Sequence, residues 1–221
     1  MARIVVLCAH PQLEHSRVTR ALARAAAGAD LPQAAPGKAL PQIAPGKSLP
    51  QVDVRDLYTL YPDYLIDVAA EQAALSGVEL LVWLHPVHWY GMTPLLKLWA
   101  DDVLAFGWAY GPGGTALRGK DLWLVVSTGG SAEAYRPDGL NRYFFDAFLP
   151  PYEQTAQLVG LRFLPPLVLH GAHRLSDGEI ETHVQTFVSR LASYPDWPEI
   201  DDLPACLVTE VPAGDRPREV G

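Results

Sequence analysis

The sequence predicts a doubly wound α/β fold in which five parallel strands, in the order 2-1-3-4-5, carry helices on both faces. Short apolar or β-branched runs alternate with helical segments along the chain, which is the pattern of a parallel sheet built with right-handed crossovers. The run Val78 to Leu84 is almost continuously apolar, as expected for a strand that is covered by helices on both sides. With 221 residues, the chain is long enough for one such domain.

The predicted strands are short. Residues 3–9 form a β-branched run that ends at His10-Pro11, and residues 51–57 alternate apolar with charged side chains. Such alternation is typical of a strand near the edge of a sheet. The other predicted strands are mainly apolar and cover residues 78–84, 120–127 and 161–170.

Helices are predicted where apolar residues recur at helical spacing. Ser16 can cap the first helix, and Thr93 before Pro94 marks the start of another, because Ser and Thr accept hydrogen bonds from first-turn N–H groups and proline suits the first helical position. Ser176 and Glu179 form a capping box at the last helix. The predicted helices follow Ser16 and cover residues 68–75, 92–104, 139–159 (broken or kinked at its Pro-Pro pair) and 177–191.

Two segments depart from this alternation. Residues 31–48 hold the tandem repeat LPQAAPGKA and LPQIAPGKS, whose two prolines and one glycine per unit exclude a helix and which is too short for a solenoid repeat. We expect residues 31–50 to form a surface insertion in a single domain that spans residues 1–194. Residues 195–221 are rich in proline and acidic residues, and we expect them to form a tail.

The composition excludes several functional classes. A formal charge of -8 argues against a nucleic-acid surface, which requires clustered Lys and Arg. The two cysteines lie far apart in the sequence and suggest no disulfide framework. No HExxH motif, closed Cys/His set or carboxylate cluster accompanies the histidines, so no metal site is expected. No signal peptide or apolar run of about 20 residues is present, and a cytoplasmic protein is expected.

Polar and aromatic residues gather after three of the predicted strands. His10 follows the first strand, the segment HPVHWYG (85–91) follows the third, and STGG (127–130) ends the fourth. Because the carboxyl ends of parallel strands meet at one edge of the sheet, ligands usually bind there. The helix that begins after Ser16 offers a seat for a phosphate, since its first N–H groups and its dipole both favour an anion. No glycine-rich dinucleotide fingerprint or Walker lysine occurs in this loop.

Together, these segments resemble the flavodoxin-like NAD(P)H:quinone reductases of the DT-diaphorase type, and among them the ancillary flavoproteins of the Kef potassium-efflux systems. The resemblance covers residues 3–192 apart from the repeat. It implies a flavodoxin-like fold, FMN or alternatively FAD as cofactor, NAD(P)H as reductant, a quinone-like acceptor and a homodimer. The order and spacing that carry it are those of residues 10–19, LYPDY (60–64), HPVHWY (85–90), PLLKLWADDV (94–103), GWAYGPGGTAL (107–117) and STGG (127–130).

The resemblance also implies which residues contact the cofactor. One group would hold the flavin phosphate, a second would flank the isoalloxazine with two aromatic walls, Trp89 and Tyr90, and a third would line the opposite edge of the ring. The three groups are His10, Ser16, Arg17, Val18 and Thr19; Val87, His88, Trp89 and Tyr90; and Ser127, Thr128, Gly129 and Gly130.

Two further residues are implied to be catalytic. Tyr135 stands where the family has a tyrosine near the flavin that steadies developing charge during hydride transfer. Asn141 stands in place of the family's histidine, and its amide retains the ability to donate a hydrogen bond.

Three functions remain open at this point. The leading hypothesis is a flavin-dependent NAD(P)H:quinone oxidoreductase that transfers two electrons by a ping-pong mechanism. The alternative is a flavin-bound regulatory subunit of a glutathione-gated potassium efflux transporter, peripheral to the inner membrane. A flavodoxin-like module that has lost its flavin is the third, and the intact STGG and HWYG segments argue against it.

Overall fold

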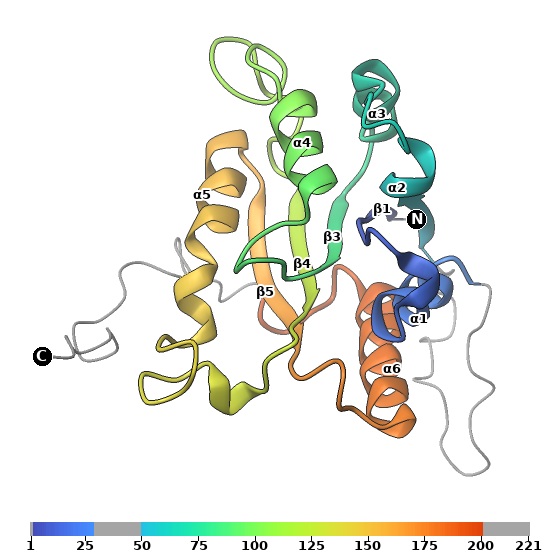
Figure 1. Cartoon of the computed structure of the whole chain (residues 1–221). Helices are drawn as coiled ribbons and strands as arrows, with labels where there is room; N and C mark the ends of the chain where they lie inside the picture. The colour runs from blue at the N-terminus through green and yellow to red at the C-terminus, as the bar shows by residue number, and fades with distance from the viewer. Residues whose placement is uncertain (1, 29–49, 201–221) are drawn as a thin grey trace, which may run out of the picture.

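The computed structural model describes residues 2–28 and 50–200 (Figure 1). The repeat at residues 31–48 and residues 201–221 lie outside this range. Its five strands form one parallel sheet in the order β2-β1-β3-β4-β5, which confirms the predicted topology. The strands are β1 (Arg3–Cys8), β2 (Gln51–Asp56), β3 (Leu80–Pro86), β4 (Asp121–Ser127) and β5 (Arg162–Leu169).

Helices cover both faces of this sheet (Figure 1). Helices α1 (Val18–Ala26) and α6 (Asp177–Ser193) pack on one face with Trp123 and Phe187 in the core between them and the sheet. The helices on the other face are α2 (Leu57–Leu60), α3 (Val68–Ala74), α4 (Pro94–Val103) and α5 (Pro150–Val159). Trp83 of β3 and Trp99 of α4 lie in the core between the sheet and these helices. The shorter 3-10 turns are η1 (Leu13–His15), η2 (Ala132–Ala134) and η3 (Phe145–Phe148).

The predicted helix caps act in two ways. The Ser16 hydroxyl oxygen accepts from the Thr19 N–H at 3.0 Å, and Ser176 and Glu179 form the expected capping box. Thr93 occupies the N-cap position of α4, but its hydroxyl donates instead to the carbonyl of Ala9 at 3.1 Å. The start of α4 is thereby tied to the end of β1.

The predicted helix at residues 139–159 is wrong in its first half. Helix α5 begins at Pro150, and residues before it form turns that include η3 and a left-handed Arg142 at φ 62°. The Pro150-Pro151 pair therefore starts the helix rather than kinking it, because a first-turn N–H has no intrahelical acceptor to lose. The sequence pattern also missed α2, a single turn capped by the Asp56 side chain.

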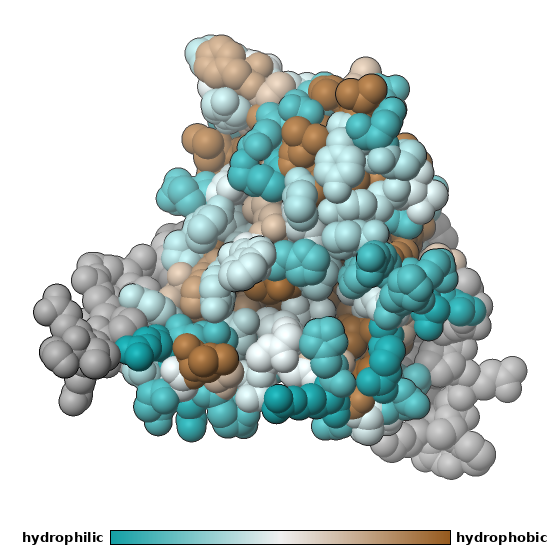
Figure 2. All heavy atoms as spheres, in the orientation of Figure 1, coloured by the Kyte–Doolittle hydropathy of each residue, from teal (hydrophilic) through white to brown (hydrophobic). Residues whose placement is uncertain are grey.

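The described chain stays packed up to Ile200. Trp197 is buried and packs against Trp123 with ring centroids 4.9 Å apart, and its indole N–H donates to the Arg190 carbonyl at 2.8 Å. Figure 2 shows hydrophobic residues at the upper tips of the molecule, with polar residues over most of the same face. None of the helices within residues 2–28 and 50–200 is both long and apolar enough to cross a membrane.

Candidate functional site at the carboxyl edge of the sheet

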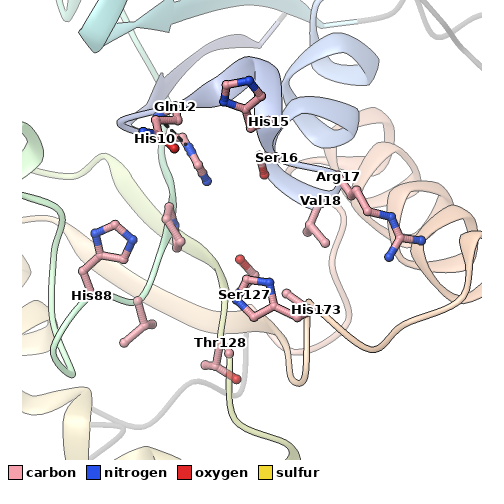
Figure 3. A pocket seen from close by; sticks show the side chains of 14 residues that line it. His10, Gln12, His15, Ser16, Arg17, Val18, His88, Ser127, Thr128 and His173 are labelled. Carbon is pink, nitrogen blue, oxygen red and sulfur yellow. Dashed lines mark hydrogen bonds between the residues drawn. The ribbon is translucent and has the colours of Figure 1, made fainter.

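A cavity of about 420 Å³ lies at the carboxyl ends of β1, β3 and β4, in front of the first turn of α1 (Figure 3). The sheet therefore brings together three predicted segments that are distant in sequence. No carboxylate lines this cavity in the described part of the chain. Its lining residues are His10, Gln12, His15, Ser16, Arg17, Val18, Pro86, Val87, His88, Ser127, Thr128, Gly129, Ala172 and His173.

His10 enters the cavity from the loop after β1. Its Nδ1 accepts a hydrogen bond from the Gln12 N–H at 3.0 Å, so the neutral ring carries its proton on Nε2. Burial lowers the pKa of His10, the neighbouring His88 lowers it further, and Asp56 opposes the shift. At neutral pH, His10 is therefore an uncharged donor.

The first turn of α1 offers further donors. The Ser16 oxygen already accepts from Thr19, which leaves its O–H free to donate. The backbone N–H groups of Arg17 and Val18 belong to the first helical turn, where no intrahelical acceptor exists. Thr19 is buried and does not line the cavity.

The guanidinium of Arg17 points away from the cavity (Figure 3). It donates to the Leu175 carbonyl at 2.9 Å and to the Asp177 carboxylate at 2.6 Å, at the start of α6. Arg17 thus presents its backbone, and not its charge, to the cavity.

The segment after β3 forms a tight two-residue turn. His88 and Gly91 exchange backbone hydrogen bonds at 3.1 and 3.0 Å, and both intervening residues, Trp89 and Tyr90, have positive φ angles of 48° and 66°, the geometry of a type I′ hairpin turn. Val87 and His88 line the cavity, but Trp89 and Tyr90 do not.

The two aromatic residues of this turn face elsewhere. Trp89 is 95% exposed. The Tyr90 hydroxyl donates to Oδ1 of Asn141 at 3.2 Å, and its ring stacks on Phe148 with centroids 5.0 Å apart. Tyr90 and Asn141 thus link the turn after β3 to the segment before α5.

At the end of β4, Ser127, Thr128 and Gly129 line the cavity, whereas Gly130 lies just beyond it. A Cβ at Gly129 would be 3.6 Å from Cδ2 and Nε2 of His173, so this glycine and this ring face each other closely. Tyr135 is 7% exposed, lies outside the cavity lining and packs edge-on against Phe145 and Phe148. Burial raises the pKa of the Tyr135 phenol.

Sequence reasoning missed five lining residues. Gln12 and His15 belong to the loop that also holds the predicted residues His10 and Ser16, and Pro86 directly precedes the predicted residue Val87. Ala172 and His173 come from the loop after β5, and the only available signal was that this fifth strand ends at the same edge of the sheet as the others. The missed residues are Gln12, His15, Pro86, Ala172 and His173.

This arrangement suits an anion attached to a larger, partly apolar group. Uncharged donors gather at the α1 end, and small residues allow close approach to the backbone at the β4 end. The volume falls in the range of roughly 300–1,000 Å³ that is typical of small-molecule sites. Among the described residues, no group of three or more His, Cys, Asp or Glu side chains is placed to hold a metal ion.

Comparison with known proteins supports this fold. A family model described as the flavodoxin-like fold matches residues 38–191. The glutathione-regulated potassium-efflux system ancillary protein KefF of Citrobacter koseri is 38% identical over 192 residues, which cover 86% of this chain and 96% of that protein.

Solved structures agree with the family match. General stress protein 14 of Treponema denticola, in complex with FMN, is 32% identical with a TM-score of 0.71 and covers 86% of this chain and 97% of its own. A structure described as a thermophilic tryptophan halogenase from Streptomycin violaceusniger is 37% identical with a TM-score of 0.70, covering 83% and 95%. An NADPH-quinone reductase from P. pentosaceus, 23% identical with a TM-score of 0.65 and covering 86% and 96%, shares the fold.

Proposed function

The chain belongs to the family with the flavodoxin-like fold, and on this premise we propose that it is a flavin-dependent NAD(P)H:quinone oxidoreductase. The observation that carries the proposal is the meeting of the α1 N-terminal donors and the small residues after β4 in one cavity. A neighbour of 32% identity was solved with FMN, which supports FMN over FAD as the cofactor of this chain.

The donor set of the cavity fits a flavin phosphate. The phosphate would accept hydrogen bonds from Nε2–H of His10, from the hydroxyl of Ser16 and from the backbone N–H groups of Arg17 and Val18. Thr19 would support these donors through its own N–H, which binds the Ser16 oxygen. Because these donors are uncharged, the helix dipole and hydrogen bonds stabilise the anion, and no lysine or arginine charge is needed.

The ring would lie against the ends of β3 and β4. Val87 and His88 would flank it on one side, and residues 127–130 would line the other edge. Trp89 and Tyr90 would fix the positions of Val87 and His88 through the turn that they form. A flavin bound here would supply two-electron hydride chemistry between NAD(P)H and a quinone.

Tyr135 and Asn141 would act on the residues that line the cavity, without lining it themselves. Tyr135 packs beside Gly130, where an added Cβ would lie 3.4 Å from its ring, and Asn141 accepts a hydrogen bond from the hydroxyl of Tyr90. We assign Tyr135 to steadying charge near the ring edge and Asn141 to fixing the turn after β3. Residues 1–194 would together make the flavin-binding domain, with residues 31–50 as an insertion.

The first test is the visible absorption spectrum of the purified protein, followed by heat release and chromatography of the released pigment. Flavin bands that NAD(P)H bleaches and a quinone restores are expected, together with parallel lines in double-reciprocal plots. A colourless protein that also fails to bind added FMN or FAD contradicts the proposal. One similar structure has a halogenase name, and a shared fold does not by itself establish a shared reaction. Tryptophan with chloride is therefore assayed in parallel.

A matched pair of cap variants locates the phosphate. Ser16→Ala and Asp67→Ala each remove a side chain that accepts from a first-turn N–H, in α1 and α3 respectively, at a cost of about 1 kcal/mol in stability. Only Ser16→Ala should also weaken FMN binding, because Asp67 lies outside the cavity lining. Equal FMN affinities of the two variants would remove Ser16 from the proposed site.

A second function is a regulatory one. The relative of 38% identity is an ancillary protein of a potassium-efflux system, which supports a role as a flavin-bound subunit at the cytoplasmic face of such a transporter. Co-expression with a neighbouring transporter gene should raise glutathione-gated potassium efflux, and a flavin-free variant separates docking from turnover. Efflux that does not change on co-expression contradicts this function.

We also propose a homodimer. Large aromatic side chains are exposed at Trp89 and Phe106, to 95% and 69%, and aromatic residues are enriched in protein interfaces. Light scattering of the flavin-loaded protein should give twice the chain mass, and a stable monomer would contradict the dimer.

A further inference from the structure

The segment after β5 is fastened to the loop after β4 by backbone hydrogen bonds. The Thr128 N–H donates to the Leu169 carbonyl at 2.9 Å, the Ala172 N–H to the Thr128 carbonyl at 2.9 Å, and the Gly171 N–H to the Gly130 carbonyl at 2.8 Å. The conformation of residues 128–130, which form one wall of the cavity, therefore depends on residues 169–172.

The side chain of His170 also contacts Thr128, from the side away from the cavity. Nδ1 of His170 lies 3.0 Å from the hydroxyl oxygen of Thr128, and His170 itself does not line the cavity. The Thr128 hydroxyl donates its single proton to the Gly130 carbonyl at 2.7 Å. Toward His170 the oxygen can only accept, so the proton of the neutral imidazole belongs on Nδ1.

The His170 ring is held in place by its neighbours. Tyr135 and Phe145 contact it with ring centroids 5.2 and 5.3 Å away. The Thr128 hydroxyl is thus held by two contacts, one to the Gly130 carbonyl and one to Nδ1 of His170.

We propose that His170 is a positioning residue of the flavin pocket, which acts through Nδ1–H on Thr128 to set the conformation of residues 128–130. The identity of the ligand rests on the proposed function, whereas the His170 contact does not. Protonation of Nε2 leaves the Nδ1–H donor intact, so the contact persists in both charge states of the ring. Its loss would free the Thr128 hydroxyl to rotate away from Gly130 and loosen the wall of the cavity.

Amide substitutions distinguish this role from simple packing. In His170→Asn the side-chain amide nitrogen stands as many bonds from Cα as Nδ1 does, whereas in His170→Gln it is one bond further. His170→Asn should keep FMN affinity within about twofold to threefold of the unchanged protein, while His170→Gln and His170→Phe weaken it about tenfold, the effect of one net hydrogen bond. FMN fluorescence quenching measures the affinity, and the thermal midpoint of each variant identifies any that fails to fold.

Nitrogen-15 NMR of the imidazole tests the contact without flavin. In the flavin-free protein, the His170 ring should carry its proton on Nδ1 and lose that preference in Thr128→Val. A ring protonated on Nε2, or equal FMN affinities for the Asn and Gln variants, overturns the proposal. If FMN does not bind at all, the proposed function fails while the NMR result still decides the role of His170 at Thr128.

Discussion

At the scale of single residues, the interior holds polar atoms that find no partner. Within the described chain these include Trp83 Nε1, His85 Nε2 and the Tyr152 hydroxyl, all buried on the α5 side of the sheet. The Tyr152 ring stacks near His85 with centroids 5.8 Å apart and meets Trp83 at 6.2 Å. Such atoms lose their hydration on folding without a compensating hydrogen bond, so they lower stability.

Removing one of these atoms should not destabilise the protein. We expect Tyr152→Phe to leave the free energy of unfolding unchanged or to raise it by about 1–2 kcal/mol, because the lost hydroxyl is unpaired. The control is Tyr194→Phe, whose hydroxyl donates to the Asp121 carboxylate at 2.7 Å and whose loss should cost about 1.5–3 kcal/mol. Urea unfolding compares the two variants, and a clear loss in Tyr152→Phe would reveal a partner for that hydroxyl.

Buried histidines should make stability depend on pH. Burial lowers the pKa of His85 and of His183 to about 4, from 6.5. Between these values the unfolded chain binds more protons than the folded one, so the stabilisation is complete above pH 6.5 and is lost as pH falls toward 4. Each ring contributes about 1.4 kcal/mol per pH unit in that window.

His183→Leu isolates one of these contributions. The variant should lose less stability than the unchanged protein between pH 6.5 and 5, by about 1.4 kcal/mol per pH unit. Its stability near pH 7 should be at least equal, because Nε2 of His183 is buried without a partner. Parallel pH profiles in urea unfolding would show that His183 keeps its ordinary pKa.

At the scale of elements, one buried carboxylate joins β2 to the helices of its face. Glu71 of α3 is fully buried and receives the Arg55 guanidinium from β2, with Nε 3.1 Å from both carboxylate oxygens. The Trp99 indole of α4 donates to it at 2.9 Å, and the Tyr61 hydroxyl donates as well. The edge strand β2 is therefore held to these helices by an ion pair whose two carboxylate oxygens both have hydrogen-bond donors, and not by apolar contact alone.

Glu71→Gln tests this connection. Removing Glu71 leaves Arg55 with only the more exposed Asp53 carboxylate at 3.8 Å as a partner, and we expect a loss of about 3 kcal/mol in the free energy of unfolding, the lower end of the range for a broken buried pair. Asp101→Asn is the control, since the Lys97–Asp101 pair on α4 is more than half exposed and such pairs contribute about 0–1 kcal/mol. Similar losses in both variants would contradict a special role for Glu71.

At the scale of the whole molecule, the two described segments that flank the repeat come close together in space. Gly28 after α1 and Pro50 before β2 line the same surface groove, together with Val188 and Leu191 of α6. Residues 29–49, which join them, lie outside the described range. A short connection could therefore replace the repeat without moving α1 or β2.

Deletion of residues 31–48 should leave a folded, flavin-binding protein. Loop-closure entropy changes slowly with loop length, so the thermal midpoint should shift by only a few degrees and FMN affinity should be unchanged. Circular dichroism and FMN titration measure both. A deletion variant that fails to fold would assign the repeat a structural role.

The fold was largely predictable because its signals are local. The apolar runs of β1, β3, β4 and β5 and the caps at Ser16 and Ser176 each lie within a few residues, and all recur in the structure. The helix that apolar periodicity predicts before Pro150 is absent because these residues adopt turn conformations, including the left-handed Arg142. A single turn such as α2 is too short to give any periodicity.

The sequence by itself determined the sheet, its order and the three loops that would meet at its carboxyl edge, since strand patterning and crossover handedness are encoded along the chain. Only the tertiary structure decided which side chains of those loops face the cavity. Arg17 turns away because Asp177 binds its guanidinium, Tyr90 because Asn141 and Phe148 hold it, and His173 enters from beyond β5. These directions depend on partners far along the chain, which no local pattern records.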